Sequence, residues 1–327
     1  MLAITLGDPT GIGPEVVVKT LADRPEIQIA LFGDVAVVEE AAKLCGVSLP
    51  PGVTVHAITQ LLEKDRRPGQ PNDEAGRAQV AYLVAATKAA LAGSVNGIVT
   101  APISKTWAGR AGFAFPGHTE YLAEACGTSE FAMMLAGPGL KVTVATTHIA
   151  LRDVPQALSV EVIERAIRLT VVSLKDQFGI AEPRVAVAAL NPHAGEDGKF
   201  GDEEGRLILP AMEHAKRKLE SEGRRFSLHG PAVPDVVFRQ ATLGKFDAVV
   251  AMYHDQGLIP VKLHDFDRTV NVTLGLPFVR TSPDHGTAYD LAGLGKARPD
   301  SFGAALDLAT KMVTQRVPKL LKAPLTK

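Results

Sequence analysis

Six short apolar runs alternate with helical patterns, and this alternation constrains the fold of the chain more than any other feature. The runs cover residues 2–6, 27–33, 96–102, 140–148, 183–190 and 246–254. Unbroken apolar runs of this length are typical of strands buried on both faces of a parallel sheet. The stretches 74–93 and 160–179 have helical periodicity, and each ends at a glycine, which suits the end of a helix. The sequence therefore predicts an α/β fold.

Length and composition exclude several classes of protein. A chain of 327 residues suggests about two domains. The 35 Lys and Arg against 36 Asp and Glu leave a net charge of −1, so no global field attracts nucleic acid or an anionic membrane. Cys45 and Cys126 form no paired motif and fit a reduced compartment, and no apolar run is long enough to span a bilayer. With no signal peptide visible, we expect a cytoplasmic protein that binds small molecules and a second copy of itself.

The first strand leads into the tight sequence GDPTGIGPE, residues 7–15. Gly11 and Gly13 permit backbone approaches that a Cβ would forbid, and Pro14 suits the first turn of a helix. The spacing matches neither the dinucleotide-binding fingerprint nor the phosphate-binding P-loop. Taken alone, the stretch is equally a strand-to-helix turn or a loop beside a cofactor.

Three of the predicted strands end in polar clusters that contain a histidine: His148, His193 and His254. Ligands of open α/β sheets bind beyond the carboxyl ends of the strands. Imidazole is the commonest transition-metal ligand, and three histidines leave a coordination position open for substrate. One such histidine is more often a hydrogen-bonded structural residue, but three in equivalent positions favour a shared metal site.

A second group of residues suits an anionic ligand. His118 and Thr119 lie at a predicted helix start, where backbone N–H groups attract phosphate or carboxylate. The alternative is that Thr119 only caps a helix that begins near Glu120. Three cationic or amide side chains in otherwise apolar sequence extend the group: Lys262, Asn271 and Arg280. Lys105 is a weaker candidate of the same kind.

The segment HGTAYDLAGLGKARPDS, residues 285–301, is rich in small residues that let a backbone wrap closely around a flat ligand. Without further context it is equally a loop followed by a helix.

In order along nearly the whole chain, these segments resemble the 4-hydroxythreonine-4-phosphate dehydrogenase family of pyridoxal phosphate biosynthesis. The similarity runs through GDPTGIGPE, TAPISK, PGHTEYLA, TTHIALRDV, NPHAGEDGKFGDEE, AMYHDQG and VNVTLGLPFVRTSPDHGTAYDLAG. The wider group is similar to the isocitrate and isopropylmalate dehydrogenases, which implies two α/β lobes with a cleft between them. Residues 1–128 with 262–327 would form the cofactor-side lobe, and residues 129–261 a central lobe that carries metal ligands and the dimer interface.

The resemblance also implies a function and a set of site residues. The expected reaction is the NAD-dependent oxidation and decarboxylation of 4-phosphohydroxy-L-threonine to 3-amino-2-oxopropyl phosphate, with NADP as an alternative cofactor. His148, His193 and His254 would hold one divalent metal per subunit (zinc, cobalt, nickel or magnesium), with ligands shared between the subunits of a homodimer. The substrate would bind to His118, Thr119, Lys262, Asn271 and Arg280. The cofactor would bind to Gly11, Gly13, His285, Gly286, Thr287, Ala288 and Asp290, and Asp255 and Lys105 are candidate proton acceptors.

Two alternatives stay open at this point. A paralogous 4-phospho-D-threonate or D-erythronate dehydrogenase would share all of these residues. A metal-dependent phosphatase or aldolase could use the same metal and phosphate groups, although it would not need the segment HGTAYDLAG.

Overall fold

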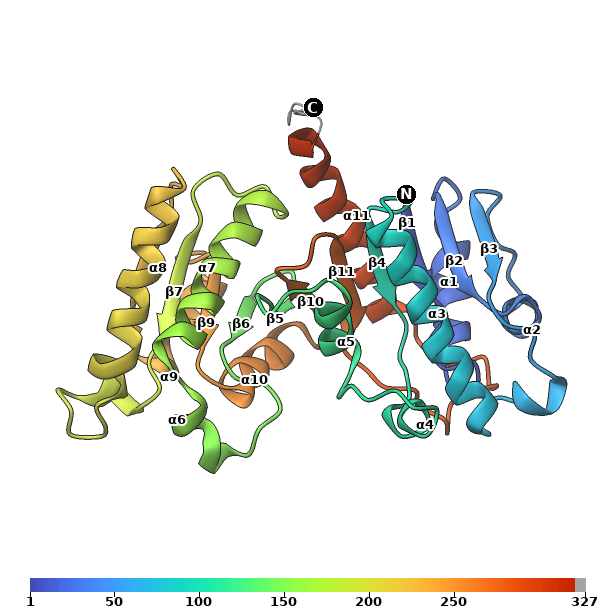
Figure 1. The fold of residues 1–327 in the computed structure, drawn as a ribbon, viewed down its shortest axis with the longest axis horizontal. Coiled ribbons are helices and arrows are strands. Elements are labelled where there is room, and N and C mark those ends of the chain that lie inside the picture. The colour runs from blue at the N-terminus through green and yellow to red at the C-terminus, as the bar shows by residue number, and fades with distance from the viewer. Residues whose placement is uncertain (321–327) are drawn as a thin grey trace. The chain divides into compact units, whose positions relative to one another are not determined.

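The computed structural model describes residues 1–320, and the chain divides into two compact units (Figure 1). The first unit comprises Met1–Ser129 and Leu276–Val313, and the second comprises Glu130–Gly275 with the residues from Thr314 onward. The predicted lobes change at 128 and 261, whereas the chain returns to the first unit only after Gly275. The reason is that residues 270–274 form a strand that pairs within the second unit. Residues 321–327 of the predicted cofactor-side lobe lie outside the described residues.

The first unit is built on five parallel strands. Their order is β3 (Val53–Ala57), β2 (Ile29–Gly33), β1 (Leu2–Thr5), β4 (Gly97–Thr100) and β11 (Val279–Pro283). Every residue of β1, β2 and β4 is buried, which explains why these strands are continuous apolar runs. The helices are α1 (Gly13–Ala22), α2 (Val35–Cys45), α3 (Asp73–Leu91), α4 (Lys105–Arg110), α5 (His118–Ala125) and most of α11 (Asp300–Leu320).

The second unit has a mixed sheet. The strand order is β10 (Val270–Leu274), β5 (Ala132–Ala136), β6 (Lys141–Val144), β9 (Ala248–Ala251), β7 (Arg184–Ala188) and β8 (Ser227–Ala232). The pairs β10–β5 and β5–β6 are antiparallel, and the remaining pairs are parallel. The helices are α6 (Val154–Ala157), α7 (Val160–Asp176), α8 (Leu209–Ser221), α9 (Pro234–Thr242) and α10 (His254–Asp265).

Helices cover both faces of this second sheet. Val142 and Val144 of β6 join one core cluster with Val237 of α9 and Leu258 of α10. The residue between them, Thr143, points the other way and accepts a hydrogen bond of 2.7 Å from Thr170 of α7. Alternate residues of a strand face opposite sides of a sheet, so a strand covered by helices on both sides buries side chains on both, and the buried Thr143 hydroxyl needs the bond that it makes.

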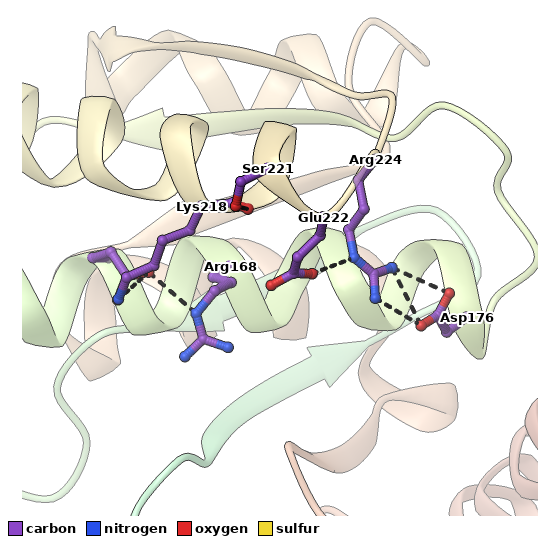
Figure 2. A network of polar contacts seen from close by, with 7 residues as sticks. Arg168, Asp176, Lys218, Ser221, Glu222 and Arg224 are labelled. Carbon is purple, nitrogen blue, oxygen red and sulfur yellow. Dashed lines mark hydrogen bonds and ion pairs between the residues drawn. The ribbon is translucent and has the colours of Figure 1, made fainter. Parts of the chain in front are cut away.

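An ionic network joins α7 to α8 and to the turn that follows it (Figure 2). The buried Glu164 accepts from Arg168 at 3.1 Å and pairs with Lys218 at 3.3 Å. Arg224 lies between Asp176, at 3.2 Å, and Glu222, at 2.8 Å. These contacts hold α7 and α8 side by side.

Candidate active-site elements

In the first unit, the opening loop packs directly against the segment HGTAYDLAG. The backbone N–H of Ile12 donates to the carbonyl oxygen of Thr287 at 2.9 Å. A Cβ at Gly11 would lie 2.9 Å from that same oxygen, and a Cβ at Gly13 would lie 2.5 Å from the carbonyl oxygen of Leu6. Both glycines are therefore required by close backbone approach. The structure brings together the two loops that the family resemblance assigns to the cofactor, and their cofactor role stays a prediction.

A second link between these loops was missed in the sequence. Asp8 is fully buried, and its Oδ1 atom accepts from the backbone N–H of Thr10 at 2.9 Å and from its hydroxyl at 2.7 Å. The Tyr289 hydroxyl donates to Asp8 Oδ2 at 2.6 Å. Burial, together with this bond, raises the pKa of Tyr289 to about 12, so the hydroxyl remains a donor at neutral pH. An aspartate two residues before a threonine in a glycine-rich turn is a signal for the local part of this arrangement alone.

Three other predicted cofactor residues lie in the segment HGTAYDLAG: His285, Ala288 and Asp290. The His285 Nδ1 atom lies 3.1 Å from the Gly286 carbonyl oxygen, and its Nε2 atom is buried without a hydrogen-bond partner among the described residues. Ala288 has a positive φ of 41°, which is unusual for a residue with a side chain. Asp290 is exposed.

A group of cationic residues lies around the start of α5. Arg280 lies in the buried strand β11 and is only 3% exposed although it is charged. Its Nη2 atom donates to the Thr100 hydroxyl at 2.8 Å. Burial lowers the pKa of Arg280 to about 10, so the guanidinium still carries its charge at neutral pH. The pKa of His118 lies well below its ordinary value because of burial and then because of the nearby charges of Arg280 and Lys105. These three side chains are therefore close enough to interact electrostatically.

His118 has the features of a ligand-binding side chain. It is the first residue of α5, and its Nε2 atom is buried without a hydrogen-bond partner in the part of the chain that the structure describes. The helix begins after Gly117, so Thr119 lies in its first turn, and the alternative in which Thr119 caps a helix beginning near Glu120 is wrong. A neutral imidazole, a guanidinium and the N–H groups of a first helical turn can together bind an anion.

In the second unit, two of the three predicted metal ligands are neighbours. The rings of His148 and His254 have centroids 5.4 Å apart. Their strands are tied at this end, because the backbone N–H and the hydroxyl of Thr146 both donate to the Met252 carbonyl oxygen, at 3.2 and 2.8 Å. The Nδ1 atom of His254 lies 2.7 Å from a carboxylate oxygen of Asp255. A carboxylate on one ring nitrogen orients the other nitrogen toward a metal, so this pair suits a transition-metal ion.

Gln256 connects this pair to the next strand and was also missed in the sequence. Its amide oxygen accepts from the backbone N–H of Met252 at 2.6 Å, and its amide nitrogen donates to the Ala189 carbonyl oxygen at 2.7 Å. One side chain thus joins the ends of β9 and β7, which lead to His254 and His193 respectively.

His193 lies on a strained loop apart from the other two histidines. Every residue from His193 to Gly198 has a positive φ, and four of them carry side chains, each at a cost of about 1–2 kcal/mol. The His193 ring contacts the Phe200 ring with centroids 6.2 Å apart, and its Nδ1 atom lies 3.8 Å from a carboxylate oxygen of Glu196. Within residues 1–320 of one chain, no three metal-binding side chains converge.

The buried carboxylate of Glu204 sets the start of this loop. It accepts from the backbone N–H groups of Leu190 and Asn191 at 2.9 and 2.8 Å. The glycines in this part of the sequence indicated a loop, but nothing in the pattern indicated that His193 itself adopts a left-handed conformation.

The remaining predicted residues of the second unit are spread over α10 and β10. Asn271 is a strand residue whose buried Oδ1 atom has no hydrogen-bond partner among the described residues. Lys262 is half-buried on α10, and Asp255 is exposed at its start.

The chain matches the family described as pyridoxal phosphate biosynthetic protein PdxA over residues 25–309. It belongs to this family. A 4-hydroxythreonine-4-phosphate dehydrogenase from Desulfosudis oleivorans is 47% identical to this PdxA family member over 325 residues, which cover 94% of this chain and 95% of the relative. The crystal structure of 4-hydroxythreonine-4-phosphate dehydrogenase from Klebsiella pneumoniae matches with a TM-score of 0.82 and 40% identity, and covers 96% of this chain and 99% of that chain.

A more distant match supports the fold alone. Isocitrate dehydrogenase from Methylococcus capsulatus matches this PdxA family member with a TM-score of 0.50 at 15% identity, and covers 97% of this chain and 86% of that chain. Together the comparisons confirm the predicted family, the predicted α/β fold of the isocitrate dehydrogenase type, and the prediction that the chain is an enzyme. None of the helices within residues 1–320 is both long enough and apolar enough to cross a bilayer.

Proposed function

We propose that this protein oxidises and decarboxylates 4-phosphohydroxy-L-threonine with NAD in the cytoplasm, and that the product is 3-amino-2-oxopropyl phosphate. The observation that carries this proposal is the buried Arg280 cation beside His118, whose buried Nε2 atom has no hydrogen-bond partner among the described residues. A phosphate group would accept hydrogen bonds from both side chains. The most similar relatives reported above carry the matching activity in their names.

Four further residues would bind the substrate. Thr119 and Lys105 would add to the phosphate site at the start of α5. Lys262 and Asn271 belong to the second unit, and the buried Asn271 Oδ1 atom suits an ammonium or hydroxyl group of the substrate.

A divalent metal fits the donors of the second unit. His148 and His254 supply two neighbouring imidazoles, and Asp255 orients one of them. Two imidazoles from one chain are an incomplete set for a structural or catalytic metal, so a third ligand, His193 of the partner subunit, would complete the site in a homodimer. When bound, the metal supplies Lewis acidity at the substrate hydroxyl and at the ketone that replaces it.

The protein's own groups would manage the protons of the reaction. The substrate hydroxyl would lose a proton to a base, for which Asp255 and Lys105 are the candidates. The carbon that bears this hydroxyl would lose a hydride to NAD. The resulting ketone lies beta to the carboxylate, so carbon dioxide can leave with its bonding electrons remaining on the carbon chain. Protonation of that carbon then gives the aminoketone phosphate, and the overall reaction consumes one NAD and yields one NADH.

The proposal is tested by following NADH at 340 nm with purified protein. We expect turnover with 4-phosphohydroxy-L-threonine, little with 4-phospho-D-threonate, and loss of turnover with a chelator. Faster turnover of 4-phospho-D-threonate would assign the protein to the paralogous activity instead, and parallel reactions with NADP would fix the cofactor preference.

The metal and dimer are tested by elemental analysis and sedimentation. His148→Ala and His254→Ala should each lose the metal, whereas His229→Ala should retain it, because His229 lies on the second unit but packs against Phe246. Wild-type protein should sediment as a dimer. A metal-replete monomer would contradict the shared site.

A further inference from the structure

The segment from Asp284 to Ala297, here called the 284–297 loop, is held in place by the opening loop and one side of α1. It has turns but no regular helix or strand. Beyond the two bonds to Ile12 and Asp8 described above, the backbone N–H of Gly293 donates to Glu15 Oε1 at 2.6 Å. The Lys19 ammonium donates to the carbonyl oxygens of Gly295 and Ala297 at 2.7 and 2.8 Å.

The spacing of these anchors explains how a short helix can hold an irregular loop. Ile12, Glu15 and Lys19 are three and four residues apart, so they lie on the same side of α1. Their partners Thr287, Gly293 and the carbonyls near Gly295 follow one another in the same order along the loop. The loop therefore runs along α1 and is bonded to it at successive turns.

The two carboxylates that hold the loop are buried, and each accepts a hydrogen bond from it. Asp8 is 0% exposed and Glu15 is 3% exposed. Burial of a carboxylate is costly unless donors compensate it, and two of the donors come from the loop, Tyr289 and the Gly293 backbone. Within the described residues, Glu15 Oε2 has no hydrogen-bond partner at all. Burial of these carboxylates lowers the stability of the folded protein, and their hydrogen bonds fix the 284–297 loop.

We propose that Asp8 and Glu15 are positioning residues for the nicotinamide dinucleotide: they hold the 284–297 loop in its binding conformation without contacting the cofactor. This inference rests on the proposed function with NAD as the oxidant, and on the expectation that His285, Gly286, Thr287, Ala288 and Asp290 bind that cofactor. A loop that is already ordered pays less entropy when it binds a ligand, so the anchors act on cofactor affinity rather than on the chemical step.

The test uses two matched tyrosine variants. Tyr289→Phe removes the hydroxyl that donates to Asp8, whereas Tyr82→Phe removes a buried hydroxyl of the same unit that bonds to Thr59 at 2.9 Å. In Tyr289→Phe we expect amide hydrogen exchange of residues 284–297 to be faster, and the Kd for NAD by calorimetry and the KM for NAD to rise about tenfold, with kcat within about twofold of wild type. Tyr82→Phe should change none of these.

A second pair of variants tests whether the hydrogen bond from Gly293 to the side chain of residue 15 is what matters. Glu15→Ala removes the acceptor of the Gly293 N–H, whereas Glu15→Gln keeps an amide oxygen at that position. We expect Glu15→Ala to behave like Tyr289→Phe, and Glu15→Gln to recover most of the lost NAD affinity. The KM for the phosphorylated substrate should stay the same in all of these variants.

The outcomes distinguish this inference from the proposed function. If wild-type protein bound NAD and Tyr289→Phe bound it equally well, or if both tyrosine variants lost the same affinity, the positioning role would be refuted and the proposed function would stand. If wild-type protein bound no dinucleotide, both would fail together.

Discussion

Replacement of Arg280 by alanine is the sharpest test of the phosphate site. Arg280 is 3% exposed and keeps its charge at neutral pH, because burial lowers its pKa only to about 10. A hydrogen bond to a charged group is worth about 1.5–3 kcal/mol. At about 1.36 kcal/mol per factor of ten, Arg280→Ala should lower kcat/KM for the phosphorylated substrate by about one to two decades.

The assay compares two substrates and a control variant. The NADH-coupled rate with unphosphorylated 4-hydroxythreonine should be slow in wild type and nearly unchanged in Arg280→Ala, because this compound has no phosphate to lose. Arg24→Ala is the control, since Arg24 in the same unit pairs with Asp307 at 2.9 Å and lies outside the group around α5. It should leave kcat/KM for both substrates unchanged. If Arg280→Ala slowed both substrates equally, Arg280 would hold the carboxylate or the fold, and the phosphate assignment would be wrong.

A lysine at this position adds a pH dependence. Lysine begins from a lower ordinary pKa than arginine, and the same burial would lower it further. Arg280→Lys should therefore retain more kcat/KM at pH 7 than at about pH 9, relative to wild type. An equal loss at both pH values would show that geometry rather than charge is limiting.

Three further predictions concern stability, each measured by chemical denaturation. Burial holds the pKa of His118 in the folded protein well below its ordinary value of 6.5, so below pH 6.5 the unfolded chain takes up a proton that the folded protein does not. The free energy of unfolding should therefore decrease by up to about 1.4 kcal/mol for each unit by which the pH falls below 6.5. His118→Gln should make this decrease smaller. Ala194→Gly should stabilise the protein by about 0.5–1 kcal/mol because Ala194 has a φ of 55°, whereas Ala215→Gly within α8 should destabilise it by about 1 kcal/mol or more. Glu164→Ala should cost about 2 kcal/mol because it leaves Arg168 and Lys218 without a buried partner, whereas Glu220→Ala, at an exposed pair of 3.9 Å, should cost less than about 0.5 kcal/mol.

The sequence by itself determined the fold class, the family and six of the strands: β1, β2, β4, β6, β7 and β9. It missed β5 and β11, although both are buried at every position. The runs that became β1, β2 and β4 are almost entirely apolar because both faces are covered, and that pattern is visible without coordinates. The strands β3 and β8 were missed because they are largely exposed and lack such a run. The strand β10 was overlooked for a different reason: its sequence is interrupted by Asn271.

Only the tertiary structure decided which site residues meet. The pairing of His148 with His254, and the separation of His193, depend on bonds between strand ends such as Thr146 to Met252, which join residues 106 positions apart. The anchoring of the 284–297 loop to Asp8 and Glu15 depends on contacts more than 270 positions apart, and buried carboxylates in a sequence look the same as solvated ones. Local patterns report the burial of a segment's own side chains, whereas a site depends on which distant backbone groups satisfy those side chains, and only the folded chain brings them together.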